Sequence, residues 1–162
     1  VYECMYPIDK VFSYADLQTL LKTSDVISLH CPLTKETSHL INKENIGFIK
    51  PGAFLVNTAR GGIVSTDALV EALQKGILRG AALDVLEEEG ETKDEIEFLT
   101  KRHPNEAELK TVLENHMLMK MPNVLITPHI AFDSEEAMRR ILTISFENID
   151  LYVAGKPQNK LV

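Results

Sequence analysis

Basic side chains follow two of the apolar segments of this 162-residue chain in a pattern that suits acid–base chemistry on a small carboxylate. Arg60 comes shortly after the run 53–57, and His129 comes shortly after the run 123–127. Arginine donates two parallel hydrogen bonds to a carboxylate, and histidine exchanges protons near neutral pH because its unperturbed pKa is about 6.5. Glu89, after a third run, would orient the imidazole and stabilise its protonated form.

Short apolar runs that alternate with helical patterns are expected to position these side chains. Strands are predicted at 1–4, 26–30, 53–57, 81–85 and 123–127. Helices are predicted after the cap at 13–16, at about 43–49, from Ser65 or Thr66 to Gly76, and from about Ser134 to Val153. This alternation predicts an α/β fold with a parallel sheet and right-handed crossovers. The near-continuous apolar run 53–57 further predicts helices on both faces of the sheet.

Ligands of parallel α/β sheets bind beyond the carboxyl ends of the strands. Four polar residues lie at or shortly after the carboxyl ends of predicted strands: His30, Arg60, Asp84 and His129. The glycines at 61–62 leave the backbone beside Arg60 open to a close approach. Each residue also has an ordinary structural explanation, a surface ion pair for Arg60 and a backbone hydrogen bond for His129. The spacing by itself leaves the catalytic and structural interpretations equally weighted.

Composition narrows the class of protein. The formal charge of -7 and the pI near 5.2 argue against nucleic acid or an anionic membrane surface as the main partner. No apolar stretch approaches the ~20 residues of a membrane span. Cys4 and Cys31 lack metal-binding spacing, which indicates reduced thiols, a cytoplasmic protein and no metal site. The charged stretch at about 90–120 is expected to be a solvated helical excursion. An ordinary structural role is expected for the remaining histidines, His39, His103 and His116.

Several segments of the chain, in the right order, resemble the D-isomer-specific 2-hydroxyacid dehydrogenase family. They are VISLHCPLTKET at 26–37 with LIN at 40–42, GAFLVNTARGG at 52–62, GAALDV at 80–85, TPHIA at 127–131 and GKPQN at 155–159. The pair Ala131-Phe132 is similar to the D-lactate dehydrogenase branch. The resemblance implies a Rossmann-type sheet and NAD-dependent interconversion of a D-2-hydroxy acid and a 2-keto acid.

The resemblance also implies roles for individual residues. The arginine that matches Arg60 holds the substrate carboxylate, the histidine that matches His129 exchanges the proton, and the glutamate that matches Glu89 orients that histidine. The aspartate that matches Asp84 contacts the nicotinamide end of NAD. The other implied cofactor-binding positions are Cys4, His30, Pro32, Thr58, Ala59 and Ala131.

Two departures from the family pattern shape the expected domain organisation. The chain contains no Gly-x-Gly-x-x-Gly, so residues 1–162 are expected to form a partial NAD-binding domain without its first strand, its glycine-rich turn or the preceding substrate domain. The expected partners are therefore the missing N-terminal half or a second copy of the chain. Cys4 stands where an aspartate usually binds the adenosine ribose, and neighbouring Glu3 would point to the other face of a strand.

Two other interpretations remain open. The first is a non-catalytic Rossmann-type module for dimerisation or ligand sensing, which the missing glycine-rich turn favours. The second is a different nucleotide-binding α/β enzyme, which would have no reason to place arginine and histidine at these strand ends. The combination of Arg60, Glu89 and His129 favours a dehydrogenase.

Overall fold

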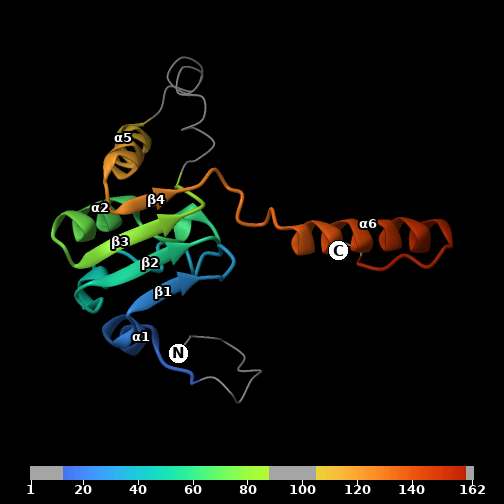
Figure 1. Cartoon of the computed structure of the whole chain (residues 1–162), viewed down its shortest axis with the longest axis horizontal. Coiled ribbons are helices and arrows are strands. Elements are labelled where there is room, and N and C mark those ends of the chain that lie inside the picture. The colour runs from blue at the N-terminus through green and yellow to red at the C-terminus, as the bar shows by residue number, and fades with distance from the viewer. Residues whose placement is uncertain (1–12, 88–104, 160–162) are drawn as a thin grey trace. The chain divides into compact units, whose positions relative to one another are not determined.

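A computed structural model describes residues 13–87 and 105–159 of the chain. The chain divides into two compact units, Val1–Pro128 and His129–Val162. A sheet forms the centre of the first unit, and a long helix dominates the second (Figure 1). The strand expected at 1–4 lies outside the described residues.

The sheet of the first unit is parallel throughout its described part. Its strands are β1 (Val26–Leu29), β2 (Ala53–Asn57), β3 (Leu78–Leu83) and β4 (Val124–Ile126). They lie side by side in the order in which they occur along the chain. The predicted parallel α/β fold is therefore confirmed. The third strand begins three residues earlier than expected and ends at Leu83, so Asp84 lies just beyond it.

Two helices of the first unit begin where the sequence predicts. Helix α1 (Leu17–Thr23) follows Asp16, whose side chain accepts a hydrogen bond from the Thr19 amide at 2.8 Å. Helix α2 (Thr66–Gln74) buries the expected apolar stripe, which includes Leu69 and Leu73. Gly76 follows its end with a φ of 69°, a left-handed conformation that glycine adopts without steric cost.

The prediction of a helix at about 43–49 is wrong in extent. The structure has only the 3₁₀-helix η1 (Ile46–Phe48) there. Asn45 precedes it without a capping hydrogen bond from its side chain. Gly47 occupies its centre, and glycine disfavours regular helix by roughly 1 kcal/mol relative to alanine. Turns occupy much of the rest of this segment.

The charged excursion is helical in its described part. Helix α5 (Glu106–Lys120) begins with a capping box, in which Asn105 and Glu108 each bond the other's backbone amide. It is not wholly solvated, because Val112, Asn115 and Leu118 are buried. Leu118 belongs to the main core of the unit.

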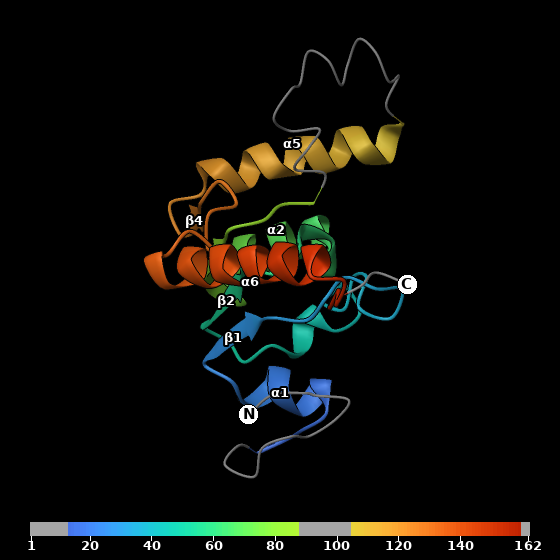
Figure 2. The same cartoon turned by 90° about the vertical axis from the view of Figure 1, so that its right-hand side faces the viewer.

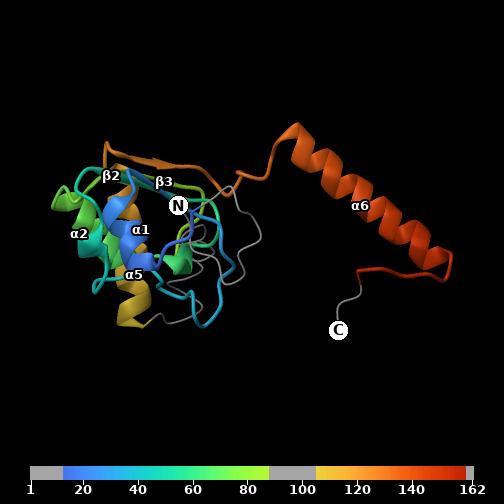
Figure 3. The same cartoon turned by 90° about the horizontal axis from the view of Figure 1, so that it is seen from below.

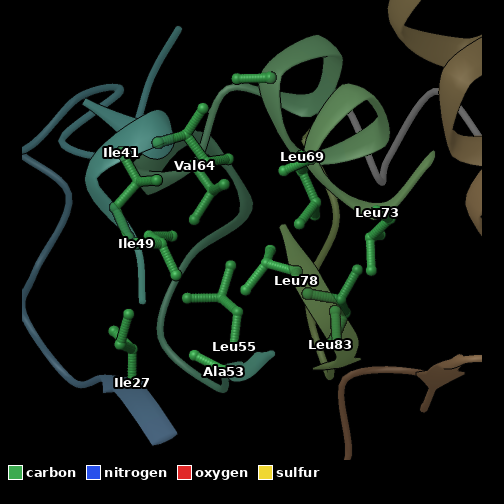
Figure 4. Close-up of a cluster of buried hydrophobic side chains, with 14 of the residues drawn as sticks. Ile27, Ile41, Ile49, Ala53, Leu55, Val64, Leu69, Leu73, Leu78 and Leu83 are labelled. Atoms are coloured by element: carbon green, nitrogen blue, oxygen red, sulfur yellow. The ribbon is translucent and has the colours of Figure 1, made fainter. Parts of the chain in front are cut away.

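That core lies on one face of the sheet. Figure 3 shows α1, α2 and α5 on the same side of the strands. Side chains from these helices meet the strands in one apolar cluster, part of which Figure 4 shows. The opposite face carries Val26, Phe54 and Leu125, whose exposed fractions are 58%, 41% and 63%. Within the described residues of the first unit, the helices therefore pack on one face of the sheet.

The second unit contains α6 (Glu135–Val153), which runs unbroken in Figure 2. Ser134 caps it by accepting a hydrogen bond from the Ala137 amide at 3.2 Å, as the sequence predicts. Its apolar residues are largely exposed, among them Phe146 at 63% and Tyr152 at 74%. Of the helices in the described ranges, none is long and apolar enough to cross a membrane.

Candidate functional site

The carboxyl ends of the strands lie at one edge of the sheet because neighbouring strands are parallel. His30 follows β1, Thr58 follows β2, Asp84 follows β3, and Thr127 follows β4. This edge is where parallel α/β sheets bind ligands. The first unit therefore brings most of the candidate residues from separate parts of the chain to one place.

A hydrogen-bonded turn after β2 sets the backbone position of Arg60. Asn57, which is only 1% exposed, accepts a hydrogen bond from the Ala59 amide at 3.0 Å and donates one to the Arg60 carbonyl at 2.9 Å. The Arg60 side chain is exposed, and its Nη1 donates to the Ala59 carbonyl at 2.6 Å. A buried amide thus fixes the turn while the guanidinium stays accessible to a ligand.

Asp84 is buried at the same edge, with an exposed fraction of 4%. Its amide donates to the Asn57 carbonyl at 2.9 Å, and the Thr127 hydroxyl donates to its carboxylate at 2.5 Å. The Thr127 amide in turn donates to the Leu83 carbonyl at 3.0 Å. Asn57 and Thr127 were assigned no role from the sequence. A polar residue at the last position of an apolar strand, or directly after it, is the signal that identifies both.

The close approach expected at the glycines occurs at Gly61. A Cβ on Gly61 would lie 2.1 Å from the carbonyl carbon and oxygen of Leu86 and 2.3 Å from the Glu87 nitrogen. At Gly62 the nearest atoms are the Leu33 methyl groups, at 3.4 and 3.7 Å. The Leu86–Glu87 peptide, shortly after Asp84, therefore packs directly on the backbone of Gly61, the residue after Arg60.

His39 contacts an acidic partner that the sequence did not reveal. Its Nε2 lies 2.6 Å from Oε1 of Glu87, and its φ is 49°, in the left-handed region. The other carboxylate oxygen of Glu87 accepts hydrogen bonds from the Thr66 hydroxyl at 2.8 Å and the Thr66 amide at 3.2 Å. These residues lie 48 positions apart at their widest, so no local pattern could pair them.

A second charged cluster lies at the start of α2. Asp67 accepts hydrogen bonds or ion pairs from Ser65, from Lys43 at 2.8 Å and from Lys110 at 3.0 Å. Burial opposes ionisation, but these three donors together hold the pKa of the Asp67 carboxyl well below its ordinary value. A groove lined by His39, Asp67 and Glu87 passes here. The carboxylates of Asp67 and Glu87 already have protein partners, which gives the cluster a structural role.

The remaining candidate residues fall into three groups: residues with described contacts in the first unit, residues in the second unit, and residues outside the described ranges. His30 is exposed and its Nε2 lies 2.8 Å from the Ser28 hydroxyl, and the Pro32 carbonyl accepts a hydrogen bond from the Thr37 hydroxyl at 2.6 Å. His129 opens the second unit with a φ of 58°, and Ala131 follows in that unit. Because Arg60 belongs to the first unit, its approach to His129 stays a prediction. Cys4 and Glu89 lie outside the described residues.

The two described ranges contain no group of three or more His, Cys, Asp or Glu side chains that could hold a metal ion.

Comparison with known proteins assigns most of the chain to one kind of domain. Residues 6–131 match the family model described as the NAD binding domain of D-isomer specific 2-hydroxyacid dehydrogenases. The 2-hydroxyacid dehydrogenase A of Aspergillus oryzae is 45% identical over 154 residues, 94% of this chain and 42% of that protein. A glyoxylate reductase of Thermofilum pendens is 41% identical over 149 residues, 92% of this chain and 38% of that protein.

A solved structure agrees with these relatives in fold. The D-lactate dehydrogenase of Aquifex aeolicus, in complex with NAD and lactic acid, superposes with a TM-score of 0.75 at 41% identity. The superposition covers 89% of this chain and 41% of that enzyme. The chain thus spans about two fifths of the length of the proteins that it matches.

Proposed function

The chain belongs to the D-isomer specific 2-hydroxyacid dehydrogenase family, and we propose that it forms the NAD-binding part of an enzyme that interconverts a D-2-hydroxy acid and a 2-keto acid. The observation that carries this proposal is the position of Arg60, an exposed guanidinium on a turn that is hydrogen-bonded to the buried Asn57, which also bonds the amide of the buried Asp84. The chain spans about 42% of the first relative, so the activity is proposed for an assembly that also contains the remaining part.

The residues at the carboxyl edge of the sheet have side chains that could bind NAD. We assign the nicotinamide end to Asp84, whose carboxylate can accept a hydrogen bond from an amide group. His30, Pro32, Thr58 and Ala59 follow β1 and β2 at this edge and would line the cofactor. Ala131 and Cys4 are assigned to the same site by family resemblance alone. The bound cofactor would supply a hydride as NADH during reduction of the keto acid and accept one as NAD+ during oxidation of the hydroxy acid.

The chain's own side chains would divide the remaining chemistry between them. Arg60 grips the substrate carboxylate with two parallel hydrogen bonds and polarises the adjacent carbonyl. His129 gives its proton to the carbonyl oxygen during reduction and recovers it during oxidation. Glu89 orients His129 and stabilises its protonated form. Cationic donors fixed near that oxygen act where negative charge develops, which is where they lower the barrier most.

The expected partners are a small 2-keto or 2-hydroxy acid and the part of the protein that the chain does not span. The exposed apolar side chains on the open face of the sheet, Val26, Phe54 and Leu125, favour contact with another polypeptide. We further propose a dimeric enzyme located in the cytoplasm. Cys31 is a free thiol, as is usual in that compartment.

The decisive experiment is a hybrid in which this chain replaces the matching segment of the Aspergillus oryzae relative. NADH oxidation is measured with a panel of 2-keto acids. Arg60→Ala should raise KM for the keto acid and lower kcat/KM by about 100-fold or more, as expected from the loss of charge-assisted hydrogen bonds worth about 3 kcal/mol. His129→Ala should lower kcat by ~10²–10⁴-fold. Near-normal turnover in the histidine variant would exclude His129 as the acid–base group.

A non-catalytic module for dimerisation or ligand sensing is the second candidate, and the open apolar face of the sheet is the observation that favours it. This candidate predicts that the hybrid binds a partner chain but turns over no keto acid. Turnover that depends on Arg60 would exclude it.

A further inference from the structure

Glu87 ties together three segments that surround the turn carrying Arg60. Its carboxylate contacts His39 at 2.6 Å and accepts two hydrogen bonds from Thr66 at 2.8 and 3.2 Å. Its carbonyl accepts a hydrogen bond from Asn115 of α5 at 2.7 Å. The side chain is only 18% exposed. A carboxylate that is so enclosed, with both oxygens bonded, holds its neighbours in one arrangement.

The backbone at Glu87 also packs closely against Gly61, the residue that follows Arg60. Gly61 lies so close to the Leu86–Glu87 peptide that a Cβ would come within 2.3 Å of its atoms. Thr66, at the far end of the same turn, is held by the Glu87 side chain. The turn from Arg60 to Thr66 therefore packs against the Leu86–Glu87 peptide near its start and is hydrogen-bonded to the Glu87 side chain at its end.

His39 reinforces this attachment from the other side. Its amide donates to the Gly62 carbonyl at 2.8 Å, in the middle of the turn, while its ring contacts Glu87. The left-handed backbone of His39, with a φ of 49°, lets both contacts form from one residue. The Arg60 side chain takes no part in these contacts and remains exposed.

We propose that Glu87, with His39 as its partner, is a positioning residue that sets the place of Arg60 at the carboxyl edge of the sheet. The inference rests on the proposed function, because the guanidinium needs a fixed backbone only if it must grip a carboxylate beside the cofactor. Misplacement of a substrate-binding group by about 1 Å can cost 10²-fold in rate. Glu87 thus acts through Arg60 and does not touch the substrate.

The test compares variants in the same hybrid enzyme. Glu87→Ala removes the carboxylate, and Glu87→Gln keeps its shape. Thr66→Val removes the hydroxyl that bonds Glu87, whereas Thr66→Ser keeps it. Glu71→Gln is the control. Glu71 lies on α2, like Thr66, and its only partner among the described contacts is the exposed Lys75.

We expect Glu87→Ala to lower kcat/KM for the keto acid by about 10- to 100-fold and to raise its KM, with KM for NADH changed less than about twofold. Thr66→Val should show a smaller loss of the same kind, and Thr66→Ser should restore activity. Glu71→Gln should match the parent. A Glu87→Ala variant within about twofold of the parent would overturn the proposal. So would equal losses for keto acid and NADH, since these would indicate a general structural role.

Amide hydrogen exchange provides a readout that does not need turnover. The amides of Ile63, Val64 and Thr66 are hydrogen-bonded within the turn or to Glu87, and they should exchange faster in Glu87→Ala than in Glu71→Gln. Unchanged exchange in Glu87→Ala would overturn the positioning role even if the parent hybrid were inactive. An inactive parent with faster exchange in Glu87→Ala would count against the proposed function and leave the contact between Glu87 and the turn supported.

Discussion

Gly61→Ala should be among the most damaging single-methyl additions in the described part of the chain. The new Cβ would lie 2.1 Å from two backbone atoms of Leu86, and an ordinary contact needs 3.4 Å or more. The two backbone segments would have to separate by about 1 Å. Overpacking of this kind costs typically 1–3 kcal/mol. The movement would also stretch the hydrogen bonds that Glu87 makes to Thr66 and Asn115, each worth about 1 kcal/mol.

The expected loss in the free energy of unfolding is therefore about 3–5 kcal/mol, a large share of the 5–15 kcal/mol typical of a domain. The chain contains no tryptophan, so urea unfolding is best followed by far-ultraviolet circular dichroism. With an m-value of about 2 kcal/mol per molar, the midpoint should fall by roughly 1.5–2.5 M. Gly62→Ala is the matched control, because its Cβ would meet only Leu33 methyl groups at 3.4 and 3.7 Å. Equal midpoints for the two variants would refute the close-packing argument.

Three further outcomes are expected of the isolated chain. The folded-state pKa of Asp67 is lowered, so the ionised side chain stabilises the fold fully above its unfolded-state pKa near 3.9, and this stabilisation declines as pH falls below about 4. In urea unfolding, the stability difference between the chain and Asp67→Asn should therefore shrink as pH is lowered below about 4. Leu125→Lys should reduce self-association in light scattering more than Leu113→Lys, which changes an equally exposed leucine on α5; equal effects would argue against association through the open face. NADH titration by calorimetry should detect little binding without the glycine-rich turn, and a dissociation constant of about 1 µM for a monomer would contradict this.

Local patterns predicted the elements of the fold wherever the physics is local. The caps at Asp16 and Ser134 and the stop at Gly76 lie where the sequence predicts. Predictions were poorer where tertiary contacts decide the outcome. The 3₁₀-helix at 46–48 replaced a longer predicted helix, and β3 starts at Leu78 because the register of the whole sheet sets its pairing with β2.

The candidate site divides in a similar way. Strand ends carry polar residues, and parallel pairing brings those ends together, so the location of Arg60 and Asp84 at one edge follows from the sequence. The expectation of a close approach at Gly61 was also confirmed, although the approaching group is the chain's own peptide. The contact between His39 and Glu87 joins loops that are distant in sequence. The periodicity of a sequence reports local structure and does not predict such contacts. The sequence alone therefore indicates only an ordinary structural role for His39.

The order of the strands has a consequence for how the chain is made. Among the described strands, β2, β3 and β4 each pair with the strand that precedes them in sequence, so a ribosome releases each of these three after the neighbour on which it docks. Parallel pairing is slow when the partner must be found far along the chain, because a long loop has to close first. Here β2 can add to β1, β3 to β2 and β4 to β3 as synthesis proceeds. The sheet can therefore grow during translation, one strand at a time, with β3 protected by β2 before β4 emerges.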